Sequence, residues 1–249
     1  GPLGLQLMRA GKDASQALQA LLAVDEHASV RQVGMVDANG NVANYTGDMA
    51  IVEHCDLTGD GFAVQANLMW KPTVCEALKA AYESSSDDLA ERMMLAMEAA
   101  EGEGGDIRGK QSAALLVVNG DRSESPWAGR VFDLRVEDHP APLVELRRLL
   151  LMNRAYNLMN EGDEHMTVGD MEAAVEAYGA AEALVPDSHE MIFWHAATLA
   201  GAGEVDAAVP LFARAFSMWP QWRELVPRLP ASGLLPDDAE LMEKILAVE

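Results

Sequence analysis

The chain has 249 residues, 49% of them hydrophobic, and a formal net charge of −22 from 40 acidic and 18 basic side chains. This length can bury a core in one large or two small domains. The negative charge repels phosphates and anionic lipid headgroups, so we expect neither nucleic acid nor a membrane as partner. Two cysteines, Cys55 and Cys75, are too few for a disulfide scaffold or an all-thiolate metal site, which favours a reducing, cytoplasmic compartment.

The first part of the chain begins with a predicted β-hairpin. Asn39-Gly40, a pair suited to a tight turn, separates apolar stretches at residues 30–37 and 41–46. Residues 61–69 then alternate as a strand, with Gln65 and Asn67 on one face. A buried amide without partners costs about 1 to 3 kcal/mol. We therefore expect these amides either to face a polar pocket or to be satisfied by neighbouring strands.

Helical spacing predicts helices over residues 73–84 and 87–100, in which a methionine stripe fills the core. A glycine-rich turn with Asp106 and Arg108 follows, and Gln111 and Ser112 open a predicted strand at 111–118. These groups would form a polar rim suited to a small zwitterion or carboxylate. Alternatively, Asp106 and Arg108 bridge within the loop and fix its shape. Ser112 lacks the Gly-x-Ser-x-Gly setting of a nucleophile.

A second group of candidates surrounds the predicted strand at residues 130–137. Asp133 and Arg135 share a strand face, and Asp138 and His139 follow at the turn. They would form an acid–base group beside strand 111–118, or Asp133 and Arg135 would only decorate an edge. Asp138 or His139 can cap a helix that opens at Pro140, and for Asp138 we favour this role over an acid–base one. The run of residues 53–56, EHCD, points its side chains alternately and is not expected to bind metal.

The last hundred residues contain an internal repeat with a period of 34. The period relates Gly169 to Gly203, Ala174 to Ala208, Tyr178 to Phe212, Ala181 to Ala215 and Pro186 to Pro220. This pattern is similar to tetratricopeptide repeats, with two units over residues 155–220 and a further helix over 239–248. Stacked repeats need about three units for stability, so we expect docking on the preceding domain or a second subunit, anchored by Trp219 and Trp222. The predicted domains are residues 1–152 and 153–249.

Five blocks of the first domain resemble an uncharacterised bacterial family, domain of unknown function 1028, which is grouped with the Ntn hydrolases. They are GPLGLQLMRAG, RQVGMVDANGNVANYTG, GDGFAVQANLM, GGDIRGKQSAALLVV and DLRVEDHP, within about residues 1–156. The resemblance implies an α+β fold, an αββα sandwich of two sheets between helices. It also implies hydrolysis of an amide bond by a Thr, Ser or Cys nucleophile on a segment that precedes these blocks. The sandwich is therefore expected to be incomplete at its N-terminus here.

Two functional classes stay open. The first is an Ntn-type amidohydrolase of a small amide or amino-acid-like compound, a homodimer without cofactor or metal, whose nucleophile lies outside this chain. The second is a non-catalytic module whose repeats bind a peptide, a protein partner or a peptidoglycan-like ligand, the last being a role described for C-terminal extensions in the family. The candidate substrate-binding residues are Gln65, Asn67, Asp106, Arg108, Gln111, Ser112, Asp133, Arg135, Asp138 and His139.

Overall fold

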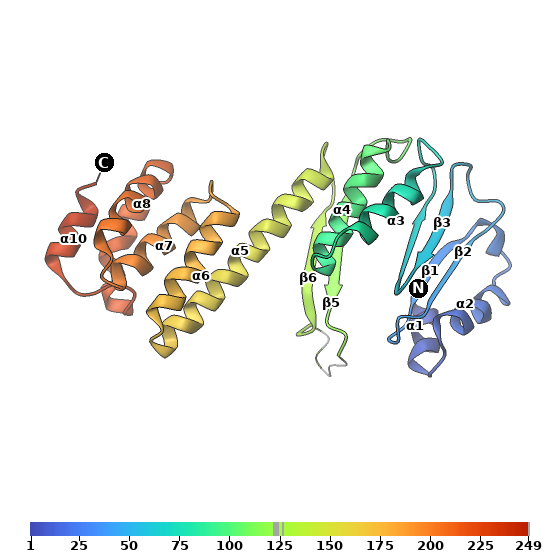
Figure 1. Ribbon diagram of the computed structural model, residues 1–249, viewed down its shortest axis with the longest axis horizontal. Helices are drawn as coiled ribbons and strands as arrows, with labels where there is room; N and C mark the ends of the chain where they lie inside the picture. Colours follow the sequence, from blue (N-terminus) through green and yellow to red (C-terminus); the bar gives the residue numbers. More distant parts are fainter. Residues whose placement is uncertain (122–124, 126, 249) are drawn as a thin grey trace. The chain divides into compact units, whose positions relative to one another are not determined.

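A computed structural model describes residues 1–121, 125 and 127–248 of the chain (Figure 1). The chain divides into two compact units, Gly1–Arg147 (unit 1) and Arg148–Glu249 (unit 2). Unit 1 combines two-stranded antiparallel sheets with helices, and the described part of unit 2 is helical, so the mixed α+β class is observed. The predicted domain boundary after residue 152 falls within helix α5 (Pro142–Val168).

The first layers of unit 1 are a helix pair and a hairpin. Helices α1 (Pro2–Arg9) and α2 (Ala14–Leu22) precede strands β1 (Gln32–Val36) and β2 (Val42–Thr46), which pair as the Asn39-Gly40 turn predicts. Gly40 has a φ of 80°, which glycine adopts without strain. Met35 and neighbouring apolar side chains on one face of the hairpin pack beneath α1 and α2. The other face of this hairpin carries polar side chains.

The next layers repeat this scheme in reverse. Strands β3 (Cys55–Gly59) and β4 (Phe62–Ala66) form a hairpin, followed by α3 (Val74–Ser84) and α4 (Leu89–Gly102). One face of the hairpin packs on α3 and α4, and its other side contacts β1 and β2. The order of layers is therefore helix pair, hairpin, hairpin, helix pair (Figure 1).

Cys55 and Cys75 correct one expectation drawn from composition. The two cysteines form a disulfide that ties β3 to α3. Disulfides persist mainly in oxidising environments, so this pair gives no support to the expected reducing compartment. Composition missed the bond because a single disulfide between a strand and its covering helix needs no cysteine-rich framework.

The last part of unit 1 is a hairpin of β5 (Ala113–Val118) and β6 (Arg130–Val136), followed by the start of α5. Strand β5 begins two residues later than predicted, so Gln111 and Ser112 lie before it. Helix α5 begins at Pro142 rather than Pro140, and the Nδ1 atom of His139 accepts a hydrogen bond from the Ala141 N–H at 3.0 Å. His139 therefore holds the residue that precedes the helix, and Asp138, the favoured cap, is exposed.

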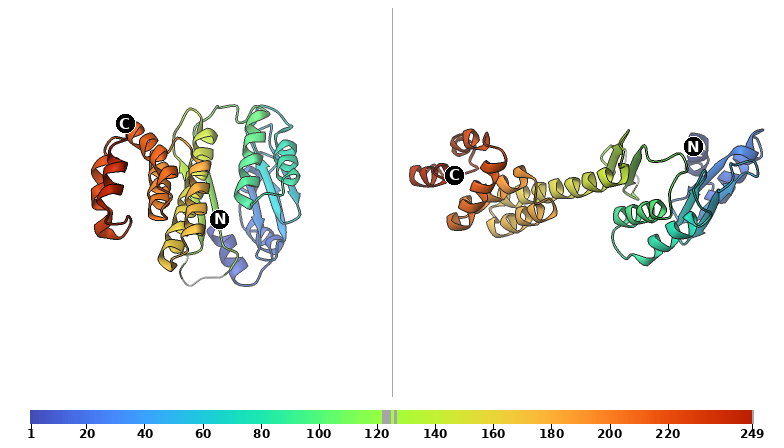
Figure 2. Two further views of the ribbon diagram at one scale, coloured as in Figure 1. Left: turned by 60° about the vertical axis from the view of Figure 1, so that its left-hand side comes forward. Right: turned by 90° about the horizontal axis from the view of Figure 1, so that it is seen from above.

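Unit 2 continues from α5 with three long helices that lie side by side in chain order, and its last helix packs back on the third of them (Figure 2). The helices after α5 are α6 (Met171–Leu184), α7 (His189–Gly201), α8 (Val205–Met218), the short α9 (Trp222–Leu225) and α10 (Ala239–Leu246), with single 3-10 turns at Val226–Arg228 and Pro230–Ser232. Another such turn, Ala28–Val30, precedes β1. Within the described residues, none of the helices has both the length and the apolar character required to cross a bilayer.

Small residues allow the helices of unit 2 to approach one another. The repeat alanines Ala174, Ala181, Ala208 and Ala215 are fully buried. A Cβ at Gly162 would lie 2.7 Å from the Tyr178 ring, so α5 and α6 meet there only with glycine. Of the two predicted docking anchors, Trp222 stacks on Phe193 within its own unit, with ring centroids 4.2 Å apart, and Trp219 is 47% exposed.

Candidate functional site

A glycine-rich loop lies against the end of strand β4. The Trp70 N–H donates to the Gly105 carbonyl at 2.9 Å, and the Ile107 N–H donates to the Leu68 carbonyl at 2.8 Å. Gly104 has a φ of 119°, and a Cβ there would lie 3.1 Å from the Trp70 side chain. Only glycine meets both conditions, so the glycines fix the loop beside β4.

This loop and the residues after it line a cavity of about 510 Å³, hereafter the 105–112 cavity. Met69, Met97 and Leu143 supply apolar lining from three separate segments. Four of the predicted site residues line it together: Asp106, Arg108, Gln111 and Ser112. The predicted polar rim on an apolar wall is therefore present at this place.

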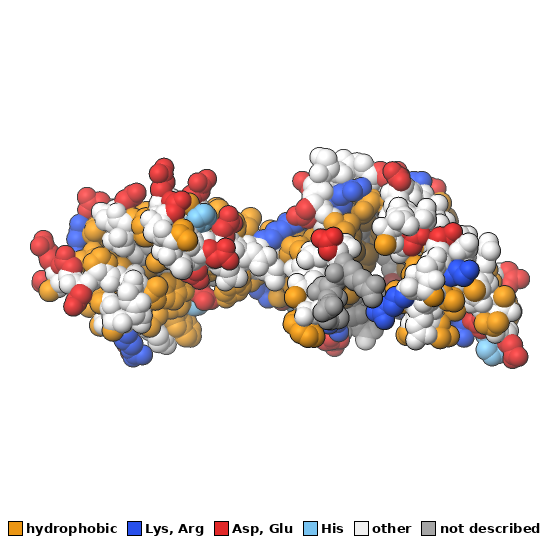
Figure 3. All heavy atoms as spheres, turned by 90° about the horizontal axis from the view of Figure 1, so that it is seen from below, with side chains coloured by type: hydrophobic (Ala, Val, Ile, Leu, Met, Phe, Trp, Pro, Cys, Tyr) orange, Lys and Arg blue, Asp and Glu red, His pale blue; other side chains and the backbone are white. Residues whose placement is uncertain are grey.

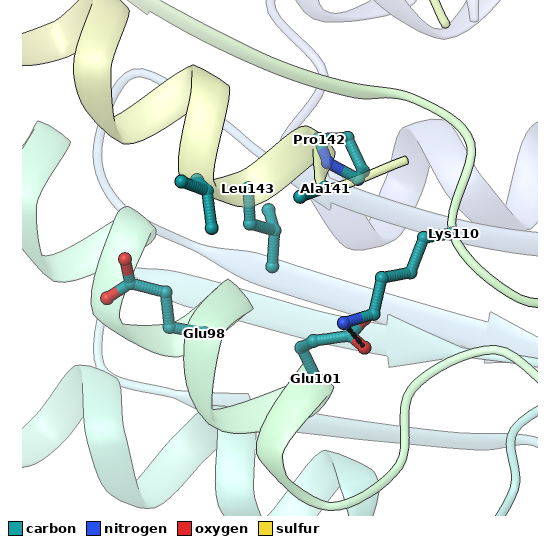
Figure 4. A pocket seen from close by; sticks show the side chains of 7 residues that line it. Glu98, Glu101, Lys110, Ala141, Pro142 and Leu143 are labelled. Carbon is teal, nitrogen blue, oxygen red and sulfur yellow. Dashed lines mark ion pairs between the residues drawn. The ribbon is translucent and has the colours of Figure 1, made fainter. Parts of the chain in front are cut away.

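A smaller cavity of about 160 Å³ adjoins the first and shares Glu101, Lys110, Pro142 and Leu143 with it. The Lys110 ammonium lies 3.0 Å from a Glu101 carboxylate oxygen, so this pair joins the loop to the end of α4 (Figure 4). The sequence reading did not include Glu101. Its position on the last turn of a helix, directly before the glycine-rich loop, is the signal that could have identified it.

Within the loop, Asp106 and Arg108 bind each other. The Arg108 Nε atom lies 2.9 Å and its Nη2 atom 2.5 Å from the two carboxylate oxygens of Asp106. The Arg108 guanidinium holds the pKa of Asp106 below its usual value, and Asp106 in turn raises the pKa of Arg108. Asp106 and Arg108 therefore form the ion pair within the loop that was one alternative, and both also line the cavity, which was the other. Lys110 also keeps spare donors beyond its contact with Glu101, since an ammonium carries three.

Arg147, near the start of α5, forms a second ionic group beside the smaller cavity. Its guanidinium donates to both carboxylate oxygens of Glu98, at 2.9 and 2.7 Å, and to Glu91. The hydrogen bonds that Arg147 donates to Glu98 are the largest cause of its raised pKa, and the one that it donates to Glu91 adds to it. This group joins α4 to α5 and fixes one wall of the smaller cavity.

Gln65 and Asn67 lie outside the lining of the 105–112 cavity and belong to a network between the first two hairpins. The Gln65 amide donates to Asn44 Oδ1 at 2.7 Å, and the Asn67 amide donates to Gln32 Oε1 at 2.9 Å. Gln32 in turn donates to the carbonyls of Cys55 and Ala66 at 3.2 and 3.0 Å. The alternative in which neighbouring strands satisfy these amides is the observed one.

The same network contains polar residues that the sequence reading missed. Asn44 donates to the Leu57 carbonyl at 2.9 Å, and Thr46 donates to the Asp56 carboxylate. Gln32, Asn44 and Thr46 recur at alternate positions of the β1–β2 hairpin. That alternation is the signal that would have placed them on one face.

The remaining candidates are divided between β6 and the following turn. Asp133 pairs with Arg130 and Arg135 at 2.9 and 3.0 Å on β6, with both arginines largely exposed, as edge decoration predicts. Asp138 is exposed, whereas the His139 N–H donates to the Gln111 carbonyl at 2.9 Å and so lies beside the cavity segment. No three His, Cys, Asp or Glu side chains of the described residues are grouped so as to hold a metal ion.

These features define an α+β domain with a polar cavity at a strand end, followed by a helical unit. Residues 1–146 match the family model of DUF1028, a family of unknown function, and the chain belongs to that family. It is also similar to the crystal structure of protein SPO2555 from Silicibacter pomeroyi, described with the same family, at 28% identity and a TM-score of 0.52. That similarity covers 60% of this chain and 64% of the other, so less than two thirds of the solved protein is matched. A search of curated proteins found no match.

Proposed function

We propose that unit 1 belongs to an amide hydrolase of the Ntn type and that the 105–112 cavity binds the polar part of a small, carboxylate-bearing amide. The observation that carries the proposal is the gathering of Asp106, Arg108, Lys110, Gln111 and Ser112 around one cavity with an apolar wall. A fold alone does not determine an activity, so the proposal depends on the side chains of this cavity.

The layering of unit 1 supports the fold part of the proposal. An αββα sandwich requires two hairpins or sheets in contact, each covered by helices on its outer face. The β1–β2 and β3–β4 hairpins, with α1–α2 on one side and α3–α4 on the other, have this order.

The cavity supplies groups for binding but not a complete catalytic set. Amide hydrolysis needs a nucleophile, a base and donors for the oxyanion. Lys110, Gln111 and the Ser112 hydroxyl offer donors, and Lys110 retains hydrogens beyond its contact with Glu101. We propose that the nucleophile is contributed from outside residues 1–249.

The proposal is tested with the complete gene product incubated with a panel of N-acyl amino acids, dipeptides and uncharged primary amides. Release of the amine is followed by mass spectrometry. We expect turnover of at least one carboxylate-bearing amide, and Lys110→Gln should raise its KM about tenfold because a charge-assisted hydrogen bond is lost.

Lys71→Gln is the matched control for that substitution. Lys71 pairs with Glu103 at 3.7 Å and is as exposed as Lys110, at 50% against 49%, but does not line the cavity. Its KM should stay at the wild-type value. Absence of amide turnover across the panel, or equal effects of the two substitutions, would contradict the proposal.

We further propose that α5 to α8 form two tetratricopeptide-like helix pairs that bind a ligand or partner. The buried alanines at both repeats and the close approach of Gly162 to Tyr178 support this. A cavity of about 610 Å³ on these helices is the observation that favours a binding role over a purely structural one.

A further inference from the structure

The cavity of about 610 Å³ in unit 2 is lined by apolar side chains and by a few side chains that carry oxygen atoms. It lies between α5, α6 and α7 and is closed at one side by Gly233 and Leu234. Met159 and Met166 supply apolar lining, while Asp163, Thr167, Tyr178 and Thr198 supply oxygen atoms. A volume of about 610 Å³ is within the range of small-ligand sites.

Every hydroxyl of this lining donates its hydrogen to the protein. Tyr178 donates to the Oδ1 atom of Asp163. Thr167 donates to the Asp163 carbonyl at 2.9 Å, and Thr198 donates to the Trp194 carbonyl at 2.9 Å. Since a hydroxyl has one hydrogen, these oxygens can only accept a hydrogen bond from a ligand.

The backbone N–H groups of Gly233 and Leu234 also donate to acceptors within the protein. The Gly233 N–H donates to the Pro230 carbonyl at 3.0 Å, and the Leu234 N–H donates to the Leu229 carbonyl at 3.1 Å. Among the lining side chains, all of them described, the indole N–H of Trp194 is the donor left over. The lining is therefore dominated by acceptors, and a ligand that fits it must be rich in donors.

The charge of the cavity agrees with this hydrogen-bond pattern. Asp163 is the charged residue of the lining. Burial, and then the hydrogen bond to Asp163, raises the pKa of Tyr178, so the phenol stays neutral. The chain from residue 153 onward has 17 acidic and 5 basic residues, and the face shown in Figure 3 carries acidic side chains over unit 2.

Aromatic rings complete the site. Tyr178 and the half-buried Trp194 both line the cavity. The faces of such rings attract an ammonium or guanidinium group within about 6 Å. A carboxylate, acceptor oxygens, aromatic rings and methionine side chains together match a cation that is carried on an aliphatic stem.

We propose that this cavity binds an organic cation, an ammonium or guanidinium group on an aliphatic stem such as that of a lysine or arginine side chain. The inference specifies the ligand for the binding role proposed above for α5 to α8, and it is independent of the proposed hydrolase activity. Asp163 pairs with the cation, and the stem lies against Met159 and Met166.

The test is isothermal titration of the whole chain with N-acetyl-lysine amide, N-acetyl-arginine amide and uncharged N-acetyl-norleucine amide. We expect the cationic probes to bind at least about tenfold more tightly than the norleucine probe, and added salt to weaken only the cationic ones. n-Butylamine and n-butylguanidine carry the same groups without peptide amides. Binding as tight as that of the amides indicates a free small cation as ligand, and weaker binding indicates a peptide side chain.

Asp163→Asn removes the charge and retains an oxygen that accepts from Tyr178, so it should weaken the cationic probes about tenfold. Glu164→Gln removes a charge from the next residue, which is exposed like Asp163 but does not line the cavity, and should leave binding unchanged. Equal binding of charged and uncharged probes overturns the cation assignment but leaves a binding role in place. Absence of binding by every probe overturns this inference alone, because capture of a different ligand class would still support the broader role.

Discussion

Asp106 is the side chain on which the shape of the 105–112 loop depends most directly. It accepts from the Arg108 backbone N–H at 2.8 Å as well as from the Arg108 guanidinium. A two-residue separation lets one carboxylate hold both the backbone and the side chain of its partner. The loop therefore presents Lys110, Gln111 and Ser112 to the cavity from a fixed base.

The contribution of Asp106 to stability should depend on pH in a defined direction. Its pKa is lowered in the folded chain, chiefly by the Arg108 side chain, below an unfolded value of about 3.9. The ionised form therefore stabilises the fold above that value, and this contribution is lost as the pH falls through the lower folded-state pKa. Asp106→Asn should cost no more than about 1 kcal/mol at pH 7 and nothing at the acid end.

Urea unfolding of the wild type and the variant between pH 2 and pH 7 measures this difference. Asp60→Asn, at an exposed acid in the β3–β4 turn, serves as the control for the loss of one carboxylate. A difference for Asp106→Asn that stays constant over the whole range would refute the role assigned to the Arg108 pair.

Arg147 provides a second prediction at the same scale. Arg147→Met leaves Glu91 and Glu98 close together without their shared cation, and this half-buried arrangement should cost about 2 kcal/mol of unfolding free energy. Arg135→Met, at a pair whose arginine is 62% exposed, should change the midpoint very little. Similar urea midpoints for the two variants would show that the Arg147 ion pairs stabilise the fold no more than the exposed Arg135 pair does.

Individual residues were the hardest part to predict. The glycines and charges of residues 104–112 predicted a polar rim because loop geometry is set by neighbours in the sequence. The partners of Gln65 and Asn67 are Asn44 and Gln32, 21 and 35 residues away, and they depend on how two hairpins meet. A pattern of alternation fixes a face of a strand but not what covers it.

At the scale of elements, the contact between β1 and β4 should tolerate little added volume. A Cβ at Gly34 would lie 2.0 Å from the Gln65 Nε2 atom, which is held by Asn44. Gly34→Ala should therefore cost about 1 to 3 kcal/mol by displacing that amide. In a Gln65→Ala background the same substitution should cost much less, a coupling that a double-mutant cycle with urea unfolding measures.

Gly102→Ala is the control for that cycle, since a Cβ at Gly102 meets nothing within 4 Å and the residue lies in α4. It should be neutral or slightly stabilising, because alanine favours a helix. If Gly34→Ala behaves like Gly102→Ala, the faces of the two hairpins are not in the contact described.

The disulfide gives the next prediction for an element. Cys55 and Cys75 are 20 residues apart, and closing a loop of that size stabilises a fold by about 3 kcal/mol in the chain-entropy view. Addition of a reductant should lower the stability of unit 1 by about that amount. A Cys55→Ser/Cys75→Ala variant should begin at the lower value and not respond to reductant, and a wild-type chain equally insensitive would contradict the bond.

Elements with strong local signals were predicted, and those that depend on distant partners were not. The β1–β2 turn, α3, α4 and β6 were found within a few residues, because glycine turns and apolar periodicity are local. Strand β3 was missed, since its CDLTG sequence has little β-branched character and reads more easily as a polar link. The short helices α1 and α2 were also missed, because eight or nine residues give a weak periodic signal.

At the scale of the whole molecule, two units with separate cores should unfold as two events. Phe193, Phe212 and Phe216 are buried in unit 2, whereas Met94 and Val74 are buried in unit 1. We expect non-coincident urea transitions by tryptophan fluorescence and by circular dichroism. Reductant should move only the transition of unit 1, and a single coincident transition that moves as a whole would refute this division.

The contact between the first two hairpins has a thermodynamic consequence. Amide side chains and carbonyl oxygens fill much of it, where most sandwiches place hydrocarbon. Exposure of polar surface lowers the heat capacity of unfolding, whereas exposure of apolar surface raises it. The free energy of unfolding of unit 1 should therefore change less with temperature than its size implies. The polar contact between the hairpins should stay stable at low temperature.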